Sequence, residues 1–502
     1  MNSFYKNLSK FVSSKLFFSI ILLIFLVSAV WIAISARYPM AFDEDYHLGL
    51  IRLHALQWNP IFTEQPTGVA QFGALTRDPS YLFHYLMSFP YRLLTALNVS
   101  QTTLVVVLRL INILLFSISL VAMRKLLLKT KASVGIIHIC LLFFVLTPVV
   151  PLLAATINYD NLQILLVAVA LLLTIRFKES LSSKKIDIKS LAWVLVVSML
   201  ACLVKFTFLP ILTAIVVYIV YLLFKFMFQH RGKLYPALSR AWRTQSRYSK
   251  LVLAIPFLIS LGLFVNTYGV NLIRYHIPVP QCGQVLDVQR CSAYPPWNRN
   301  HNFALHNTGV DPNPLPFMVS WIAGMFDRLF FTINGHGRVA DNTNYLAPIM
   351  SATAILIALF GIALVIRYGR QLIRRDSVLG FLLFTTFVYC ASLWGRNYND
   401  YLHLGKIVAI NGRYLIPIIL PVYLLVAQGY QRFLVGRQTL KALILSTAFL
   451  LFLQGGGAIS FIYYSNSNWY WPRNQFVNHL NNNAKRIINP LFLSGDFPYN
   501  IK

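Results

Sequence analysis

The sequence predicts an all-α polytopic membrane protein, and two observations carry this prediction. Of the 502 residues, 57% are hydrophobic and only 12% are charged, with a mean hydropathy of +0.61. A soluble domain typically carries about 25% charged residues. Apolar stretches of 17 or more residues recur along the chain, each long enough to cross a hydrocarbon core of roughly 30 Å. A soluble enzyme is therefore excluded.

Hydropathy predicts eleven principal spans, at residues 16–36, 104–123, 134–153, 161–177, 191–209, 211–228, 251–269, 346–366, 379–395, 413–430 and 441–464. Two more apolar segments, 80–97 and 315–333, are either membrane elements or surface helices, so the bundle holds about 11–13 helices. The first span follows several lysines and lacks a small-residue cleavage site, which predicts an uncleaved anchor.

The formal charge of +29 is explained by topology. With the N-terminus in the cytoplasm, the predicted cytoplasmic segments hold 26 of the 44 Lys and Arg residues but only three of the fifteen acids. This is the pattern of the positive-inside rule. It predicts that the partner of the chain is the lipid bilayer of the cell (plasma) membrane, and it disfavours nucleic acid.

The chain is predicted to form one transmembrane module, residues 1–464, followed by a short outer tail, 465–502. Two outer segments are long, at 37–103 and 270–345, and the second could act as a lid. It contains Cys282 and Cys291. Because an outer face is oxidising, these two cysteines are predicted to form a disulfide.

Three of the fifteen acids are consecutive, namely Asp43, Glu44 and Asp45, in FDEDYH directly after the first span. Acids in the first turn of a helix stabilise its dipole, but three in a row also suit proton transfer or a divalent cation. His47 follows Asp43 by four residues and so shares its helix face. Metal ligation and an ordinary hydrogen bond remain alternatives for this histidine.

Further polar residues fall in the same or neighbouring outer segments. Arg77 and His84 lie in TRDPSYLFHYL, and Asp160 lies in INYDNL before the fourth span; a turn and a helix cap are the plain alternatives. Cations near this side are candidate phosphate ligands, although they could also anchor the helices at the interface. They are Lys205 in LVKFTFLP, Arg396 in WGRNYNDYLHLGK, and Arg413 with Tyr414 in INGRYLIP.

Carboxylates and phosphate-binding cations thus gather on one predicted side of the membrane. This arrangement is expected of an enzyme whose substrate has a phosphate at the headgroup level and a tail in lipid. No HExxH, GxSxG, P-loop or strand-linked GxGxxG motif offers another chemistry.

Together these motifs resemble those of the GT-C superfamily, integral-membrane glycosyltransferases that use polyprenyl-phosphate-linked sugars. The resemblance rests on FDEDYH, RDPSYLFHYL, INYDNL, the lysine in LVKFTFLP, the long later outer loop and GRYLIP, in that order. The order of these motifs is similar to that in protein mannosyltransferases and aminoarabinose transferases. It is most similar to that in a bacterial branch of membrane proteins that share the DE-x-x-H and GRYL-x-P motifs. The RDPS run departs from the basic–Pro–Pro–Leu run of relatives.

The resemblance implies a GT-C-like bundle that transfers a hexosyl or pentosyl group, with inversion, from a polyprenyl-phosphate donor to a hydroxyl of a cell-envelope or protein acceptor. Asp43 would be the general base, and Glu44 or Asp45 would orient the acceptor or assist. Lys205 and Arg413 would hold the phosphate. Asp160 would line the sugar or acceptor pocket. No cofactor is certain, and relatives differ in their need for a divalent cation such as Mg²⁺ or Mn²⁺. The alternative is a transporter or flippase of lipid-linked sugars.

Overall fold

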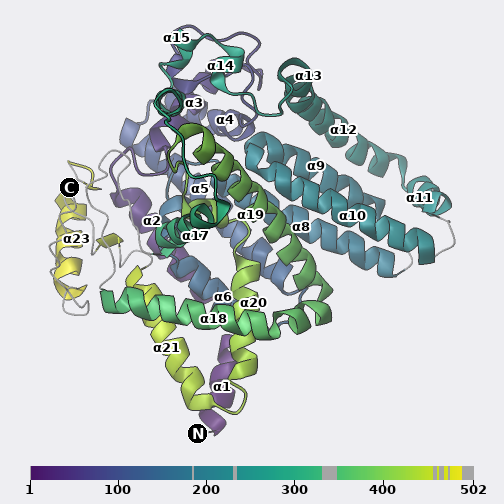
Figure 1. Ribbon diagram of the computed structural model, residues 1–502, viewed down its shortest axis with the longest axis vertical. Coiled ribbons are helices and arrows are strands. Elements are labelled where there is room, and N and C mark those ends of the chain that lie inside the picture. Colours follow the sequence, from purple (N-terminus) through teal and green to yellow (C-terminus); the bar gives the residue numbers. More distant parts are fainter. Residues whose placement is uncertain are drawn as a thin grey trace.

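The computed structural model describes residues 2–183, 186–229, 234–330, 348–455, 461–462, 469–472 and 475–488. These residues form helices joined by turns, and one isolated antiparallel bridge pairs Ala36 with Tyr470 (Figure 1). The α-helices are α1 (Asn2–Val12), α2 (Lys15–Ser35), α3 (Glu44–Ala55), α4 (Leu82–Ala96), α5 (Gln101–Leu127), α6 (Val134–Leu146), α7 (Val149–Ala154), α8 (Asp160–Ser182), α9 (Ile188–Val204), α10 (Leu209–Gln229), α11 (Leu234–Arg243), α12 (Arg247–Phe264), α13 (Val270–Tyr275), α14 (Cys282–Val285), α15 (Val288–Cys291), α16 (Pro295–Leu305), α17 (Pro314–Phe330), α18 (Pro348–Arg375), α19 (Ser377–Leu404), α20 (Leu420–Phe433), α21 (Gln438–Gly455) and α23 (Gln475–Ile488).

Six of the described helical segments are long and apolar enough to cross a membrane. They are Lys15–Ser35, Gln101–Leu127, Phe206–Gln229, Arg247–Tyr275, Ala352–Arg375 and Ser377–Leu404. Shorter apolar helices such as α6 and α9 lie among them. This arrangement confirms the predicted all-α polytopic membrane protein.

Two predicted spans differ from the structure where prolines interrupt them. The span predicted at 134–153 is two helices, because α6 ends at Leu146 and α7 begins after Pro148. The span predicted to begin at 413 has a short 3-10 helix, η4 (Gly412–Leu415), and α20 starts only at Leu420. Proline lacks the N–H that a continuing helix would need. Arg413 therefore lies in a tight turn rather than in a long helix.

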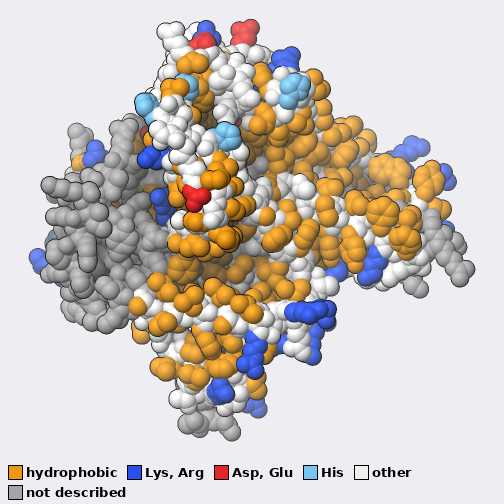
Figure 2. Space-filling view, in the orientation of Figure 1, with side chains coloured by type: hydrophobic (Ala, Val, Ile, Leu, Met, Phe, Trp, Pro, Cys, Tyr) orange, Lys and Arg blue, Asp and Glu red, His pale blue; other side chains and the backbone are white. Residues whose placement is uncertain are grey.

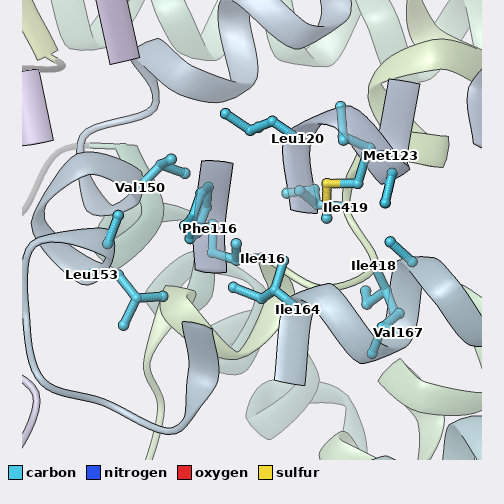
Figure 3. Packing of buried hydrophobic residues seen from close by; sticks show 14 of the residues in the cluster. Phe116, Leu120, Met123, Val150, Leu153, Ile164, Val167, Ile416, Ile418 and Ile419 are labelled. Carbon is cyan, nitrogen blue, oxygen red and sulfur yellow. The ribbon is translucent and has the colours of Figure 1, made fainter. Parts of the chain in front are cut away.

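The interior of the bundle is formed largely by α5, α8 and α9, which pack along one another. Figure 3 shows Phe116 of α5 and Ile164 of α8 beside Ile416 and Ile418, which lie between η4 and α20. These four side chains are at most 3% exposed. A fully buried Ile or Phe side chain is stabilised by about 1.5–3 kcal/mol relative to an exposed one. This packing anchors the segment that carries Arg413.

The two segments left open by hydropathy are both helical. Residues 80–97 contain α4, which packs against α3, and residues 315–333 contain most of α17 before the described range ends at residue 330. In the second long loop Cys282 and Cys291 form a disulfide with an S–S distance of 2.07 Å. Most of the predicted tail, 465–502, and residues 331–345 of this loop lie outside the described residues.

Basic side chains are unevenly placed on the surface. Figure 2 shows Lys and Arg gathered at α11 and at the turn from α18 into α19. Both regions belong to predicted cytoplasmic segments, and they include Arg240, Arg243, Arg374 and Arg375. The orientation of the chain in the membrane stays a prediction from the positive-inside rule.

Candidate functional site

Asp43 is held in an uncommon backbone conformation. Both Phe42 and Asp43 are left-handed, with φ of 65° and 62°, and the side chain of Asp43 makes no cap hydrogen bond to α3. Non-glycine residues in this region cost on the order of 1–3 kcal/mol and concentrate at functional sites. Asn158 fixes the turn by donating from Nδ2 to the carbonyl of Phe42 at 2.8 Å. The carboxylate is thereby directed to the site rather than to its own helix.

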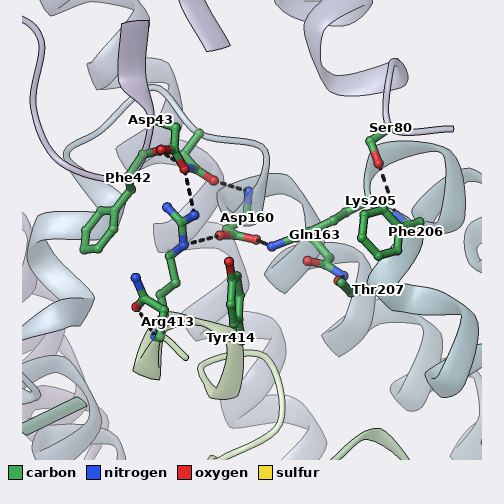
Figure 4. A network of polar contacts seen from close by, with 12 residues as sticks. Phe42, Asp43, Ser80, Asp160, Gln163, Lys205, Phe206, Thr207, Arg413 and Tyr414 are labelled. Carbon is green, nitrogen blue, oxygen red and sulfur yellow. Dashed lines mark hydrogen bonds and ion pairs between the residues drawn. The ribbon is translucent and has the colours of Figure 1, made fainter. Parts of the chain in front are cut away.

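Four charged side chains form a chain of alternating sign (Figure 4). The guanidinium of Arg413 donates from an Nη atom to Asp43 at 2.9 Å, and its Nε lies 3.9 Å from Asp160. The other oxygen of Asp160 accepts from Lys205 at 2.5 Å. The side chain of Asp43 is 64% exposed, whereas those of Asp160 and Lys205 are 3% exposed. The chain therefore runs from an accessible carboxylate into the interior.

Aromatic rings contact both cations, Lys205 and Arg413. Lys205 is the C-cap residue of α9, where the helix dipole favours a positive charge. Its ammonium lies 4.6 Å from the ring centroid of Tyr159 and 4.9 Å from that of Tyr414. The guanidinium of Arg413 lies 5.4 Å from the same Tyr414 ring. Tyr414 thus contacts both cations through its ring face.

Several polar atoms of these four charged side chains make no hydrogen bond among the described residues. Nε and one Nη atom of Arg413 and one oxygen of Asp160 are buried without a hydrogen-bond partner among the described residues. Buried polar groups are nearly always paired, so such atoms point to a ligand or to water. The guanidinium fork matches a phosphate or carboxylate group. The arrangement can therefore bind an anion beside an accessible carboxylate.

Glu44 is enclosed in a separate buried ion pair. Its two oxygens accept from Nε and Nη2 of Arg109 at 2.7 Å each, and both side chains are 0% exposed. Glu44 also accepts from the main-chain N–H groups of Met40 and Ile157, while Arg109 donates to the carbonyls of Ala33 and Ala36. This pair joins the end of α2 to α5 and to the turn before α8. Sequence reasoning did not place Arg109 in the site, although a lone charge inside an apolar span was the available signal.

The histidines of the first outer loop contact each other. Nδ1 of His47 lies 2.9 Å from Nε2 of His84, whose Nδ1 lies 3.1 Å from the carbonyl of Ser80. Burial and the charges of Arg413 and Lys205 lower the pKa of His47 well below its usual value. His47 is therefore neutral at neutral pH and can accept one hydrogen bond.

Three of the acids near the site are each paired with a cation of the protein. Asp43, Glu44 and Asp160 each lie against an Arg or Lys side chain. Within the described ranges no group of three or more His, Cys, Asp or Glu side chains could hold a metal ion. Asp43, Glu44 and Asp160 therefore do not form one acidic cluster, and a divalent cation at the site stays a prediction from the sequence.

Three predicted site residues lie at the margin of this arrangement. Asp45 is an exposed residue in the first turn of α3. The guanidinium of Arg396 in α19 lies over the ring of Phe206, with 4.7 Å from Cζ to the ring centroid. Phe206 is the residue that follows Lys205 in the sequence. Arg77 lines a different small pocket, and its carbonyl accepts from Asn271 of α13. The structure therefore groups Asp43, Asp160, Lys205, Arg413 and Tyr414 but leaves Arg77 apart.

The position of Arg413 also depends on the preceding glycine. A Cβ added to Gly412 would lie 2.6 Å from the main-chain nitrogen of Leu329 in α17. We expect Gly412→Ala to push η4 from α17, to destabilise the protein by about 1–3 kcal/mol, and to weaken anion binding. Thermal unfolding and phosphate binding would be measured against Gly395→Ala, where an added Cβ meets open space. Equal behaviour of the two variants would contradict this prediction.

Comparison with known proteins gives limited information. No family model matches the chain, and no curated protein matches it. Among solved structures, the chain is similar to the archaeal oligosaccharyltransferase AglB from Archaeoglobus fulgidus, in complex with an inhibitory peptide and a dolichol-phosphate. The identity is 13% and the TM-score is 0.43, over 94% of this chain and 60% of that chain. A likeness at this level does not indicate an activity, so a functional assignment depends on the geometry of the site.

Proposed function

We propose that the protein is a GT-C-type membrane glycosyltransferase. It moves a sugar from a polyprenyl-phosphate donor to an acceptor hydroxyl on the extracytoplasmic side of the plasma membrane. The observation that supports this proposal is the chain Asp43–Arg413–Asp160–Lys205, which places an accessible carboxylate beside cations with unused hydrogen-bond donors. A phosphate at the lipid headgroup and a reacting hydroxyl require these two features side by side.

Asp43 acts as the general base. Its exposed carboxylate takes the proton of the acceptor hydroxyl as the oxygen attacks the anomeric carbon. The bond from that carbon to the phosphate oxygen breaks on the opposite face, so the configuration inverts. The electron pair leaves with polyprenyl phosphate. Positioned bases of this kind contribute about 10²–10⁴-fold to rate.

Arg413 and Lys205 stabilise the departing phosphate. Negative charge on the leaving oxygen grows as the glycosidic bond breaks, and fixed cations in a site shielded from water stabilise it strongly. The two cations share Asp160 between them, so they are held close to each other before substrate arrives. Tyr414 keeps the ring-face contact with both.

The other predicted residues receive supporting roles. Glu44 is a positioning residue rather than a second catalytic acid, because its oxygens are engaged by Arg109 and by main-chain N–H groups. His47, held by His84, offers a neutral hydrogen-bond acceptor near the base. Asp45, which is exposed in the first turn of α3, helps to orient the acceptor, and Arg396, which contacts Phe206, adds a cation near Lys205.

The test uses membranes with and without the protein and a panel of labelled polyprenyl-phosphate hexoses and pentoses. The expected result is acceptor-dependent release of free polyprenyl phosphate, only where the protein is present. Transfer of the intact labelled donor between leaflets without release would instead identify a flippase. Sealed vesicles of each orientation, given a membrane-impermeant acceptor, would report the side of the reaction.

A further inference from the structure

The charges of the site already neutralise one another without any substrate. Two carboxylates, Asp43 and Asp160, face two cations, Arg413 and Lys205. An anionic ligand that uses these cations must therefore compete with a carboxylate of the protein. This competition decides whether Asp43 is paired with Arg413 or released from it when an acceptor arrives.

We propose that the phosphate of the donor displaces Asp43 from Arg413, so that the base becomes available only after the donor has bound. This inference rests on the proposed function and adds to it a compulsory order of binding, with donor before acceptor. Asp43 then has two roles, as a competitor for the phosphate site in the free protein and as the base in the loaded one.

The structure shows which carboxylate yields. The side chain of Asp43 is 64% exposed and is held to Arg413 by a hydrogen bond of 2.9 Å, so water can hydrate it as soon as it leaves. Asp160 is 3% exposed and is held by Lys205 at 2.5 Å, so breaking its pair would leave an unpaired buried charge. Breaking a buried pair is far more costly than breaking an exposed one. Asp43 is therefore the group that moves.

Arg413 is built to stay in place while its partner changes. Its main-chain N–H donates to the side chain of Asn411 at 3.1 Å, and Gly412 packs directly on the backbone of α17. Nε and Nη1 of Arg413 make no hydrogen bond among the described residues, so they provide donors for phosphate oxygens before Asp43 moves away. The donor phosphate, a diester of the sugar and the lipid, carries one negative charge, so it replaces the carboxylate beside Arg413 without changing the net charge of the site.

Binding order also controls the reactivity of Asp43. In the free protein the carboxylate of Asp43 accepts a hydrogen bond from Arg413 at 2.9 Å, so this oxygen is not available to an acceptor hydroxyl. Once the phosphate occupies Arg413, the carboxylate loses that partner. Both of its oxygens can then face the acceptor hydroxyl when the sugar is in place.

The test measures the binding of a short-chain polyprenyl monophosphate, without a sugar, to the full-length protein by calorimetry in lipid nanodiscs. Asp43→Asn removes the competing charge and, because Asn tolerates a positive φ, keeps the turn. We expect the variant to bind roughly fivefold more tightly than the unaltered protein. The corresponding alcohol, which lacks the phosphate, should bind both equally.

Two further variants make the outcome decisive. Asp43→Gly removes the side chain at a position that favours glycine and should also bind more tightly. Glu64→Gln removes one charge from an exposed residue of the same loop and should leave phosphate affinity unchanged. Unchanged or weaker binding by both Asp43 variants, or a gain of equal size in Glu64→Gln, would overturn the proposal.

The result is separable from the proposed function. Tighter phosphate binding by the Asp43 variants, with no sugar release from any donor, would support the competition between phosphate and Asp43. The same result would contradict the proposed transferase activity. Loss of sugar release in Asp43→Asn with unchanged phosphate affinity would keep the transferase and remove the competition. Equal binding of phosphate and alcohol by the unaltered protein would remove both.

Discussion

Replacing Asp43 with Asn is expected to lower the rate of sugar transfer by at least ~100-fold, because the amide cannot accept the proton of the acceptor hydroxyl. The change keeps the size of the side chain and tolerates the φ of 62° at this position. Turnover would be followed as release of polyprenyl phosphate at saturating donor and equal expression. The thermal midpoint should change little, since the side chain is largely exposed.

The matched control is Glu64→Gln, an acid-to-amide change at an exposed position of the same loop, and it should retain the rate. Asp43→Glu keeps the carboxylate but extends it by one methylene, so an intermediate rate is expected. Turnover of Asp43→Asn within tenfold of the unaltered protein would place the base elsewhere. His47 would then be the next residue to test.

Replacing Arg109 with Met is expected to produce the largest loss of stability. The change leaves the carboxyl group of Glu44, which is 0% exposed, with no cation beside it. Breaking a buried pair in this way costs about 3–5 kcal/mol. The free energy of unfolding would be measured in mixed micelles, together with the fraction of protein that folds on expression. Sugar transfer should fall as well, since the pair fixes the turn that precedes Asp43.

Two variants separate the buried charge from the lost side chain. In the double variant Glu44→Gln with Arg109→Met, no buried charge remains, so much of the lost stability should return. The control, Arg124→Met, makes the same substitution in the last turn of α5, where the arginine donates to His138 and is partly buried. If Arg109→Met is no more destabilising than Arg124→Met, the pair is not a structural anchor.

Most spans could be predicted from the sequence because hydropathy is a sum over neighbouring residues. The segment around Arg413 could not, since its apolar composition suits a helix, whereas Pro417 interrupts one and Pro421 lies in the first turn of α20. The resulting 3-10 turn places Arg413 beside α17 and α7. In the predicted continuous helix, the side chain of Arg413 would have pointed in a different direction.

The structure brings several candidate residues together but pairs them in a way that the sequence does not indicate. Asp43, Asp160, Lys205 and Arg413 were all candidates from the sequence, and the structure brings them together. Sequence reasoning treated Asp43, Glu44 and Asp45 as one cluster. The structure separates them, with Glu44 turned inward to Arg109 and Asp43 turned to Arg413. A helix start sends adjacent side chains in different directions, and only the surroundings decide what each one meets.

The sequence by itself determined that the chain is an all-α membrane protein, that its basic residues favour one orientation, and that its acids are few and grouped. These properties depend on composition and on local order along the chain. Only the tertiary structure decided that Glu44 pairs with a residue 65 positions away and Asp43 with one 370 positions away. Ion pairs form between residues that folding brings within about 4 Å, and the linear spacing of charges carries no record of that distance.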